Sequence, residues 1–290
     1  MEQSVTSLQK TQSGTLSHQQ SIVTVGDLEQ AMLKIFPAKD ACDWDYTGMF
    51  VGNPAAPIEG VAVALDPSIA FMRAALDANA NVLVTHHPVF LDAPTSFLPA
   101  SVQGATAGAA VHFALTHGLS CMAFHTACDA SVKGLAALPG ILRLSIKSVL
   151  EPYDYDHTKG FGQVCSVEEA CTLQQLSARC VSVFESHPRV WGNPEKIISS
   201  VVTCGGSAGS VIQSCLDKNI DCLICGELKY HDALWAYESG LCIIELGHDV
   251  SENPLVALLA SAVVASGVPE EKISLQKNVH NWYIPEALRR

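Results

Sequence analysis

Short apolar runs alternate with longer stretches of helical periodicity along most of this 290-residue chain. The first half contains Gly60–Leu65, Val82–Thr85 and Leu119–Phe124, and the second half contains Ile197–Thr203, Cys222–Cys225 and Leu241–Leu246. Strands separated by helical patterns of roughly 10–15 residues are typical of βαβ units with largely parallel sheets. The sequence therefore predicts an α/β fold.

Capping residues and prolines predict where the helices begin and end. A first helix is expected from Thr24 to Phe36, with Asp27 as the capping partner of Thr24 and Pro37 after its end. Further helices are expected at Pro67–Ala78, Gly104–Thr116, Ala208–Lys218, Tyr230–Glu238 and Glu252–Ala265.

The two halves of the chain resemble each other. The stretch Leu76–Val84 parallels Leu216–Ile224, and Gly118–His125 parallels Gly240–His248. Any βαβ unit can produce such strings, but a histidine follows the strand in both halves, which favours a duplication. We therefore predict two pseudo-symmetric α/β lobes with a cleft between them.

Besides the two predicted lobes, the chain has a connecting segment and an N-terminal tail. The N-terminal half is expected over residues 21–130 and the C-terminal half over residues 195–290. Residues 131–194 lack the alternation; a loop at Tyr153–His157, a strand at Phe161–Val167 and a helix near Leu173–Phe184 are expected there as connecting structure. Residues 1–20 are polar and are expected to form a flexible tail.

Composition excludes several classes of protein. Hydrophobic residues make up 48% of the chain, which allows a large core, and the net charge is −12 without a basic cluster, so direct nucleic-acid binding is not expected. The longest apolar stretch, Pro254–Val268, is too short to span a bilayer, and the polar start is not a signal peptide. We expect a soluble, cytoplasmic protein.

Eleven cysteines lie scattered in apolar runs, where free thiols behave as small hydrophobic groups. This usage indicates a reducing compartment. Cys222 and Cys225 match a C-x-x-C string, but residues three apart on a strand face opposite sides of a sheet. A shared metal or redox role is therefore not predicted for this pair.

Histidine and carboxylate residues gather directly after the predicted strands. His86 and His87 follow one strand, and His125 and Asp129 follow the next. Since strand ends meet at one edge of a parallel sheet, such residues can converge on a metal. Imidazole is a common ligand for transition metals, although one buried and one exposed histidine would be the simpler interpretation of a lone pair.

His248 and Glu252 form a further group after the last strand. They are four residues apart, so a helix capped by Asp249 would place them one turn apart on one face, where they could hold an ion. A helix with a favourable acidic first turn is the alternative. Together the groups offer enough ligands for two metals.

Three other groups could serve the same site. Glu227 and His231 follow a strand and could handle protons, although a capped helix start would explain them equally well. Gly205, Gly206 and Ser207 join a strand to a helix, and their amides could bind a phosphate, or the glycines could form a tight βα turn. Asp45 lies in a structured loop and could face the site.

These motifs, taken in order, resemble the Nif-three-like (YbgI-like) family, whose members are often named type-two GTP cyclohydrolase I. The resemblance covers about Ile22 to Trp282 and rests on the strings around Trp44, THHPVFL, HTACD, CGGSAG, GELKYHD and GHDVSE. It implies two α/β lobes with two metals in the cleft and a toroidal hexamer. The metal ligands it implies are His86, His87, Asp129, His248 and Glu252.

Two functions follow as hypotheses. The first is a dinuclear metal-dependent hydrolase that acts on a purine nucleotide and holds two divalent ions (Zn, Fe, Mn or Co). Its catalytic residues would be His125, Glu227 and His231, and Gly205–Ser207 would hold the phosphate. The second is a non-catalytic protein that stores or delivers metal or binds a partner. In both, the partners expected are a small molecule and further copies of the chain.

Overall fold

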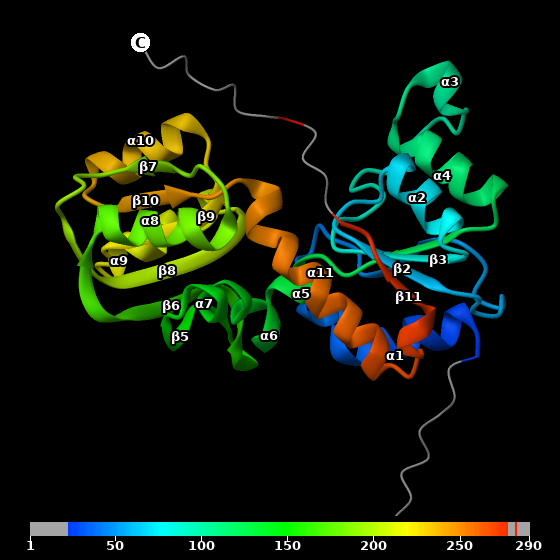
Figure 1. Cartoon of the computed structure of the whole chain (residues 1–290), viewed down its shortest axis with the longest axis horizontal. Coiled ribbons are helices and arrows are strands. Elements are labelled where there is room, and N and C mark those ends of the chain that lie inside the picture. The colour runs from blue at the N-terminus through cyan, green and yellow to red at the C-terminus, as the bar shows by residue number, and fades with distance from the viewer. Residues whose placement is uncertain (1–22, 278–281, 283–290) are drawn as a thin grey trace, which may run out of the picture.

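The computed structural model describes residues 23–277 and Trp282. Two lobes, each built on one β-sheet, lie on either side of a long helix (Figure 1). The tail expected over residues 1–20 lies outside the described residues. Within the part that is described, no helix has the length and apolar character needed to cross a membrane.

The first sheet has the strand order β1-β4-β3-β2-β11. Its strands are β1 (Gly48–Val51), β2 (Val61–Ala64), β3 (Val82–Thr85), β4 (Ser120–Ala123) and β11 (Ile273–Leu275). All are parallel except β1, which runs antiparallel to β4. Because both faces of the sheet are covered, the residues of β2, β3 and β4 are buried throughout.

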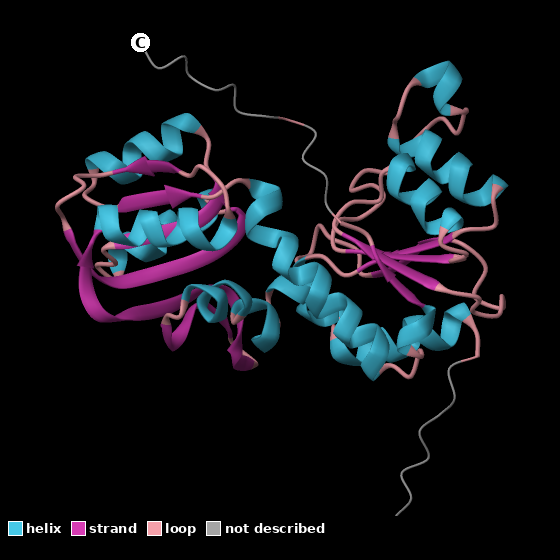
Figure 2. Ribbon diagram, in the orientation of Figure 1, coloured by secondary structure: helices cyan, strands magenta, loops and turns pink. Residues whose placement is uncertain are grey.

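Helices cover both faces of the first sheet (Figure 2). One face carries α2 (Ile69–Asp77) and α4 (Ala107–Thr116), with the short α3 (Ala100–Gln103) beside α4. The other face packs against α1 (Val25–Ile35) and the C-terminal part of α11 (His248–Ala265). The 3-10 turn η1 (Ala38–Asp40) and α5 (Thr126–Asp129) complete this lobe.

The second sheet has the order β5-β6-β8-β9-β10-β7. Its strands are β5 (Ser145–Tyr153), β6 (Asp156–Thr172), β7 (Arg189–Trp191), β8 (Ile197–Ser207), β9 (Cys222–Glu227) and β10 (Cys242–Glu245). The middle strands β8, β9 and β10 are parallel, whereas β5, β6 and β7 are antiparallel to their neighbours. Residues 131–194, expected to be connecting structure, thus supply β5, β6 and β7.

Helices also cover both faces of the second sheet. One face packs against α7 (Ala137–Leu142) and α8 (Leu173–Phe184), and the other packs against α9 (Ile212–Asp217) and α10 (Tyr230–Glu238). The remaining elements are α6 (Val132–Leu135) and the 3-10 turns η2 (Gly209–Val211) and η3 (Glu270–Lys272). Cys222 and Cys225 lie in the cores on opposite faces of β9, as the strand geometry predicts. All eleven cysteines are free thiols.

The lobes share a structural repeat. In each, the order of elements is a capped helix, an edge strand and then three parallel strands joined by helices: α1-β1-β2-α2-β3-α4-β4 and α8-β7-β8-α9-β9-α10-β10. Thr24 and Thr172 form equivalent capping boxes before the first helix of each repeat. Asn79 and Asn219 both adopt positive φ, 56° and 50°, before the middle strand. The predicted two-lobe α/β fold is confirmed.

Most predicted boundaries agree with the structure, and the differences have local causes. Ser68 caps α2 and Thr106 caps α4, so both helices begin later than predicted, because hydroxyl caps satisfy the first amides better than Pro67 or Gly104. Helix α11 begins at His248 rather than Glu252, because Gly247 takes φ 105° and turns the chain directly from β10 into the helix.

Candidate metal centre

The first turn of α11 meets the ends of β3 and β4 between the lobes. His86 and His87 directly follow β3, Asp129 ends α5 after β4, and His248 and Glu252 lie in α11. Three sets of side chains each have ligand atoms within 4.8 Å of one another. They are His87, His248 and Glu252; His86, Asp129 and Glu252; and His86, His87 and His125.

Glu252 lies at the middle of this cluster and is buried. Its Oε2 is 2.9 Å from His87 Nε2 and 3.0 Å from His248 Nε2. Its Oε1 is 3.7 Å from His86 Nε2, which in turn is 3.6 Å from Asp129 Oδ1. The two oxygens of one carboxylate therefore face two different sets of ligands, which is the arrangement of a bridging ligand.

His86 tests whether the residues fit a metal. Its side chain is completely buried, and neither ring nitrogen has a hydrogen-bond partner among the described residues. An unpaired polar group in a protein interior is unfavourable, and such groups in native structures usually have a specific partner. A divalent ion between His86, Asp129 and Glu252 would supply that partner. Mixed imidazole and carboxylate donors suit Zn, Fe, Mn and Co.

Carboxylates outside the cluster fix the histidine rings. Asp66 Oδ1 is 2.7 Å from His87 Nδ1, and Glu227 Oε1 is 3.0 Å from His248 Nδ1. Such partners hold Nδ1 protonated and point Nε2 at the metal position. Sequence reasoning missed Asp66; the signal is its place just past β2, at the same edge of the sheet as His86.

His125 has a looser neighbour in Asp45, which lies beside its Nδ1 without the geometry of a hydrogen bond. Its Nδ1 lies 3.4 Å from Asp45 Oδ2, which also accepts hydrogen bonds from the amide and hydroxyl of Thr126. The His125 ring centre is 5.2 Å from that of His86 and 5.6 Å from that of His87. His125 therefore lies close enough to the cluster to act on a group bound there.

The charges of the cluster shift its pKa values. Burial lowers the pKa of His87, but hydrogen bonds to Asp66 and Glu252 outweigh burial and raise it to about 10. A hydrogen bond to Glu252 raises the pKa of His248 to about 9. Although burial opposes it, contact with three histidines holds the pKa of Glu252 far below its usual range. In the metal-free protein these histidines hold protons, which a metal must displace.

Close packing explains Gly206, near the end of β8. Gly206 has φ +60°, and a Cβ there would lie 2.2 Å from Glu252 Oε1. The amide of Gly206 donates to Ser251 Oγ, and the amide of Ala208 donates to the carbonyl of Glu227. Because the Gly206 amide is engaged within the protein, it is not free for a phosphate, and the role predicted for Gly205–Ser207 stays a prediction.

His231 lies apart from the cluster. Its side chain is exposed in the first turn of α10, and its ring meets the edge of Tyr230, its neighbour in sequence. The structure therefore brings Glu227 and His125 to the metal centre but does not bring His231 there. A catalytic role for His231 remains a sequence-based prediction without a contact to support it.

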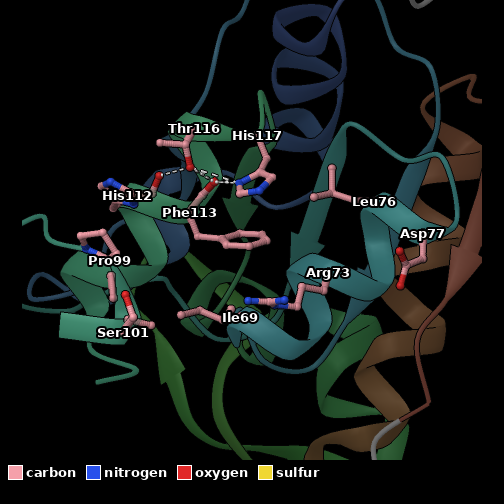
Figure 3. A pocket seen from close by; sticks show the side chains of 12 residues that line it. Ile69, Arg73, Leu76, Asp77, Pro99, Ser101, His112, Phe113, Thr116 and His117 are labelled. Carbon is pink, nitrogen blue, oxygen red and sulfur yellow. Dashed lines mark hydrogen bonds between the residues drawn. The ribbon is translucent and has the colours of Figure 1, made fainter. Parts of the chain in front are cut away.

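The cluster opens into a cleft with a volume of about 620 Å³. Both lobes line it, the first through Trp44, His125 and Asp129 and the second through Phe161 and Cys204. Its size lies within the range of roughly 300–1,000 Å³ that is usual for small-molecule sites. A second cavity of about 370 Å³ lies between α2 and α4, beside Arg73, Phe113 and His117 (Figure 3). It lies outside the metal cluster, so the larger cleft is the candidate site.

Solved structures share this fold. A Bacillus cereus protein related to NIF3 is 17% identical, with a TM-score of 0.80 over 92% of this chain and 100% of the other. The Staphylococcus aureus protein SA1388 is 20% identical, with a TM-score of 0.81 over 90% and 99% of the two chains. At these identities the likeness concerns the fold.

Sequence relatives point the same way. A Streptomyces coelicolor protein named GTP cyclohydrolase 1 type 2 homolog is 28% identical over 238 residues, which cover 80% of this chain and 82% of the relative. The Schizosaccharomyces pombe protein NIF3 homolog is 26% identical over 85% and 91% of the two chains. The family model for Duf34/NIF3 (NGG1p interacting factor 3) matches residues 23–278. This chain is therefore a member of the Duf34/NIF3 family.

Proposed function

We propose that this protein is a dinuclear metal-dependent hydrolase whose substrate is a purine nucleotide or a related purine compound. The observation that carries the proposal is the shared carboxylate: Glu252 belongs to two ligand sets, one with His87 and His248 and one with His86 and Asp129. Divalent ions at such a site would act as Lewis acids and supply a nucleophile from water near neutral pH. The names of the bacterial relatives suggest the purine.

The residues around the cluster have distinct proposed roles. His125, paired with Asp45 and next to His86, would accept or donate a proton on a bound substrate. Glu227 would orient His248 through its hydrogen bond to Nδ1. The lobes together would shield the reacting group, since both line the cleft.

Two further properties belong to the proposal. The resemblance implies a homohexamer, and exposed apolar side chains between Leu91 and Val102 offer a surface for self-association. Eleven free thiols favour a reducing, cytoplasmic location.

Turnover by purified, metal-loaded protein tests the hydrolase proposal. A panel of GTP, other purine nucleotides, nucleosides and simple phosphoesters should contain at least one compound that is converted many times per chain. His125→Gln should keep its metal and lose about 10²-fold in turnover, the usual scale for a positioned acid or base. His187→Gln, on an exposed loop, is the matched control. Loss of metal in His125→Gln would make His125 a ligand instead.

Metal storage or delivery is the second candidate function. It is favoured by the exposure of Asp66 and Glu227, the carboxylates that hold His87 and His248. Their side chains are 43% and 58% accessible and could pass an ion to a partner. If no compound turns over with any metal, and metal transfers to an acceptor protein or chelator within minutes, this function replaces the first.

A further inference from the structure

The described walls of the metal cleft carry no lysine or arginine. Among the described residues that line it, the charged groups besides histidine are Asp129, Glu151 and Glu252, and none is Lys or Arg. The whole chain has a net charge of −12. Proteins that bind a polyphosphate usually present Lys, Arg or free backbone amides along it. The walls therefore offer no lysine or arginine partner to such a chain of phosphates.

Two lysines near the cleft, Lys159 and Lys218, are engaged elsewhere, whereas Lys133, beside the lining residue Gly134, is exposed and does not line the cleft. Lys159, next to the lining residue Gly160, forms an ion pair with the buried Asp40. Lys218 donates a hydrogen bond to the carbonyl of Leu150. Moving either lysine into the cleft would break a partly buried contact, and for Lys159 would leave the Asp40 carboxylate without its cation. These lysines are therefore not available to a ligand.

Two backbone amides at the end of β8 are engaged as well. In this glycine-rich segment, where the sequence suggested a phosphate cradle, the Gly206 amide donates to Ser251 Oγ, at 3.0 Å, and the Ala208 amide donates to Glu227 O, at 3.2 Å. An anion would therefore meet the strongest positive charge at the metal centre, because divalent ions there would exceed the charge of Asp129 and Glu252.

The rest of the cleft offers apolar and aromatic surface. Leu135, Leu138 and Leu255 form part of its wall, and Phe161 lies on the hairpin strand β6. Trp44 is 61% exposed and stands edge-on to His125, with ring centres 5.8 Å apart. Flat rings pack well against such side chains. The cleft therefore suits an uncharged ring next to one polar or anionic group at the metals.

From this geometry we infer that the substrate is an uncharged ring compound with at most one anionic group, such as a purine base, a nucleoside or a monophosphate, and not a nucleoside triphosphate. The inference rests on the proposed function, which it narrows. The anionic or polar group would lie at the metal centre, and the ring would lie between Trp44 and the apolar wall.

Binding by the full-length protein loaded with Zn²⁺ tests the inference without turnover. Calorimetry and the quenching of Trp44 fluorescence are measured with guanosine, GMP and GTP, with metal content checked before and after. We expect guanosine or GMP to bind at least about tenfold more tightly than GTP, because the lining has no Lys or Arg to pair with the additional phosphates. Trp44→Phe should lose the quenching but keep the preference. GTP binding equal to or tighter than both other ligands would overturn the inference.

A cation placed in the wall gives a second test. Ser210 is exposed and lines the cleft, so Ser210→Lys should fold and raise GTP affinity about tenfold while leaving guanosine unchanged. Ser239→Lys, exposed at the end of α10, is the matched control and should change neither. An unchanged GTP affinity in Ser210→Lys would contradict the charge argument. A lack of turnover with every compound would instead count against the hydrolase, with the binding preference intact.

Discussion

At the scale of single residues, the metal centre depends on atoms that are not ligands. Gly206 and Gly205 are adjacent, but only Gly206 has a positive φ and only its Cβ would contact a Glu252 oxygen. Asp66 and Glu227 each fix the ring of a histidine in the cluster. The candidate ligands follow from a recognisable pattern of histidine and carboxylate after strands, whereas Asp66, although it lies just past β2, has its partner 21 residues away in sequence.

The two glycines give a matched pair of variants. Gly206→Ala should lower metal affinity by at least about tenfold, because the added Cβ would displace the Glu252 carboxylate and strain a left-handed backbone. Gly205→Ala should bind metal as the wild type does, since its Cβ would be 3.4 Å from Glu252 Cγ, an ordinary contact. Zn²⁺ titration against a competing chelator measures both. Equal affinities in the two variants would contradict this role of Gly206.

At the scale of elements, the sequence predicts where the strands and helices lie more accurately than it predicts the residue at which each helix begins. Strand β3 and helices α8 and α10 have the predicted bounds, because their patterns end at clear turns. The long strand β6 was predicted only in part, at Phe161–Val167, because its outer residues are largely exposed and are held by pairing with β5 at one end and with β8 at the other rather than by burial. That pairing is a tertiary effect, which a local pattern does not encode.

Asp221 makes the connection between β8 and β9 dependent on pH. Its Oδ2 accepts hydrogen bonds from the amides and hydroxyls of Ser199 and Ser200. Burial works against the charge, but these bonds prevail and lower the pKa of Asp221. A lowered folded-state pKa gives stabilisation that is present above the unfolded pKa of 3.8 and is lost as the pH falls through the folded value.

Urea denaturation of Asp221→Asn should therefore show a loss of unfolding free energy that depends on pH. We expect the loss to be about 1 kcal/mol at pH 7, a modest value because the carboxylate is partly exposed, and to be smaller near pH 3. The control Asp77→Asn, at an exposed position of α2, should leave the unfolding free energy unchanged at both pH values. A loss that is the same at both pH values would assign the effect to shape rather than charge.

At the scale of the whole molecule, two copies of one repeat create a site that neither contains alone. The first repeat supplies His86, His87 and Asp129, and the helix that follows the second repeat supplies His248 and Glu252. The sequence could predict the repeat from two short parallels. Sequence reasoning missed that α8 and β7 belong to the second copy, because these elements share with α1 and β1 their order and the capping residues Thr24 and Thr172 rather than a longer sequence parallel.

The outer surface of the first lobe predicts self-association. Three large apolar side chains, Phe97, Leu98 and Val102, are between 48% and 68% exposed on α3 and the segment before it. Light scattering at micromolar concentration should give a mass about six times the 30.9 kDa of the monomer, and Phe97→Asp should lower it. A wild-type mass near 30.9 kDa would reject the hexamer.

The central claim is that Glu252 bridges two metal positions, and metal content measured by plasma emission tests it most directly. Purified wild type reconstituted with Zn²⁺ should hold about two ions per chain, by the logic of two-metal sites. Asp129→Ala and His248→Ala should each hold about one, since each belongs to only one ligand set, and Glu252→Ala should hold almost none. An unchanged metal content in Glu252→Ala, or the loss of a single ion in that variant, would contradict the shared carboxylate.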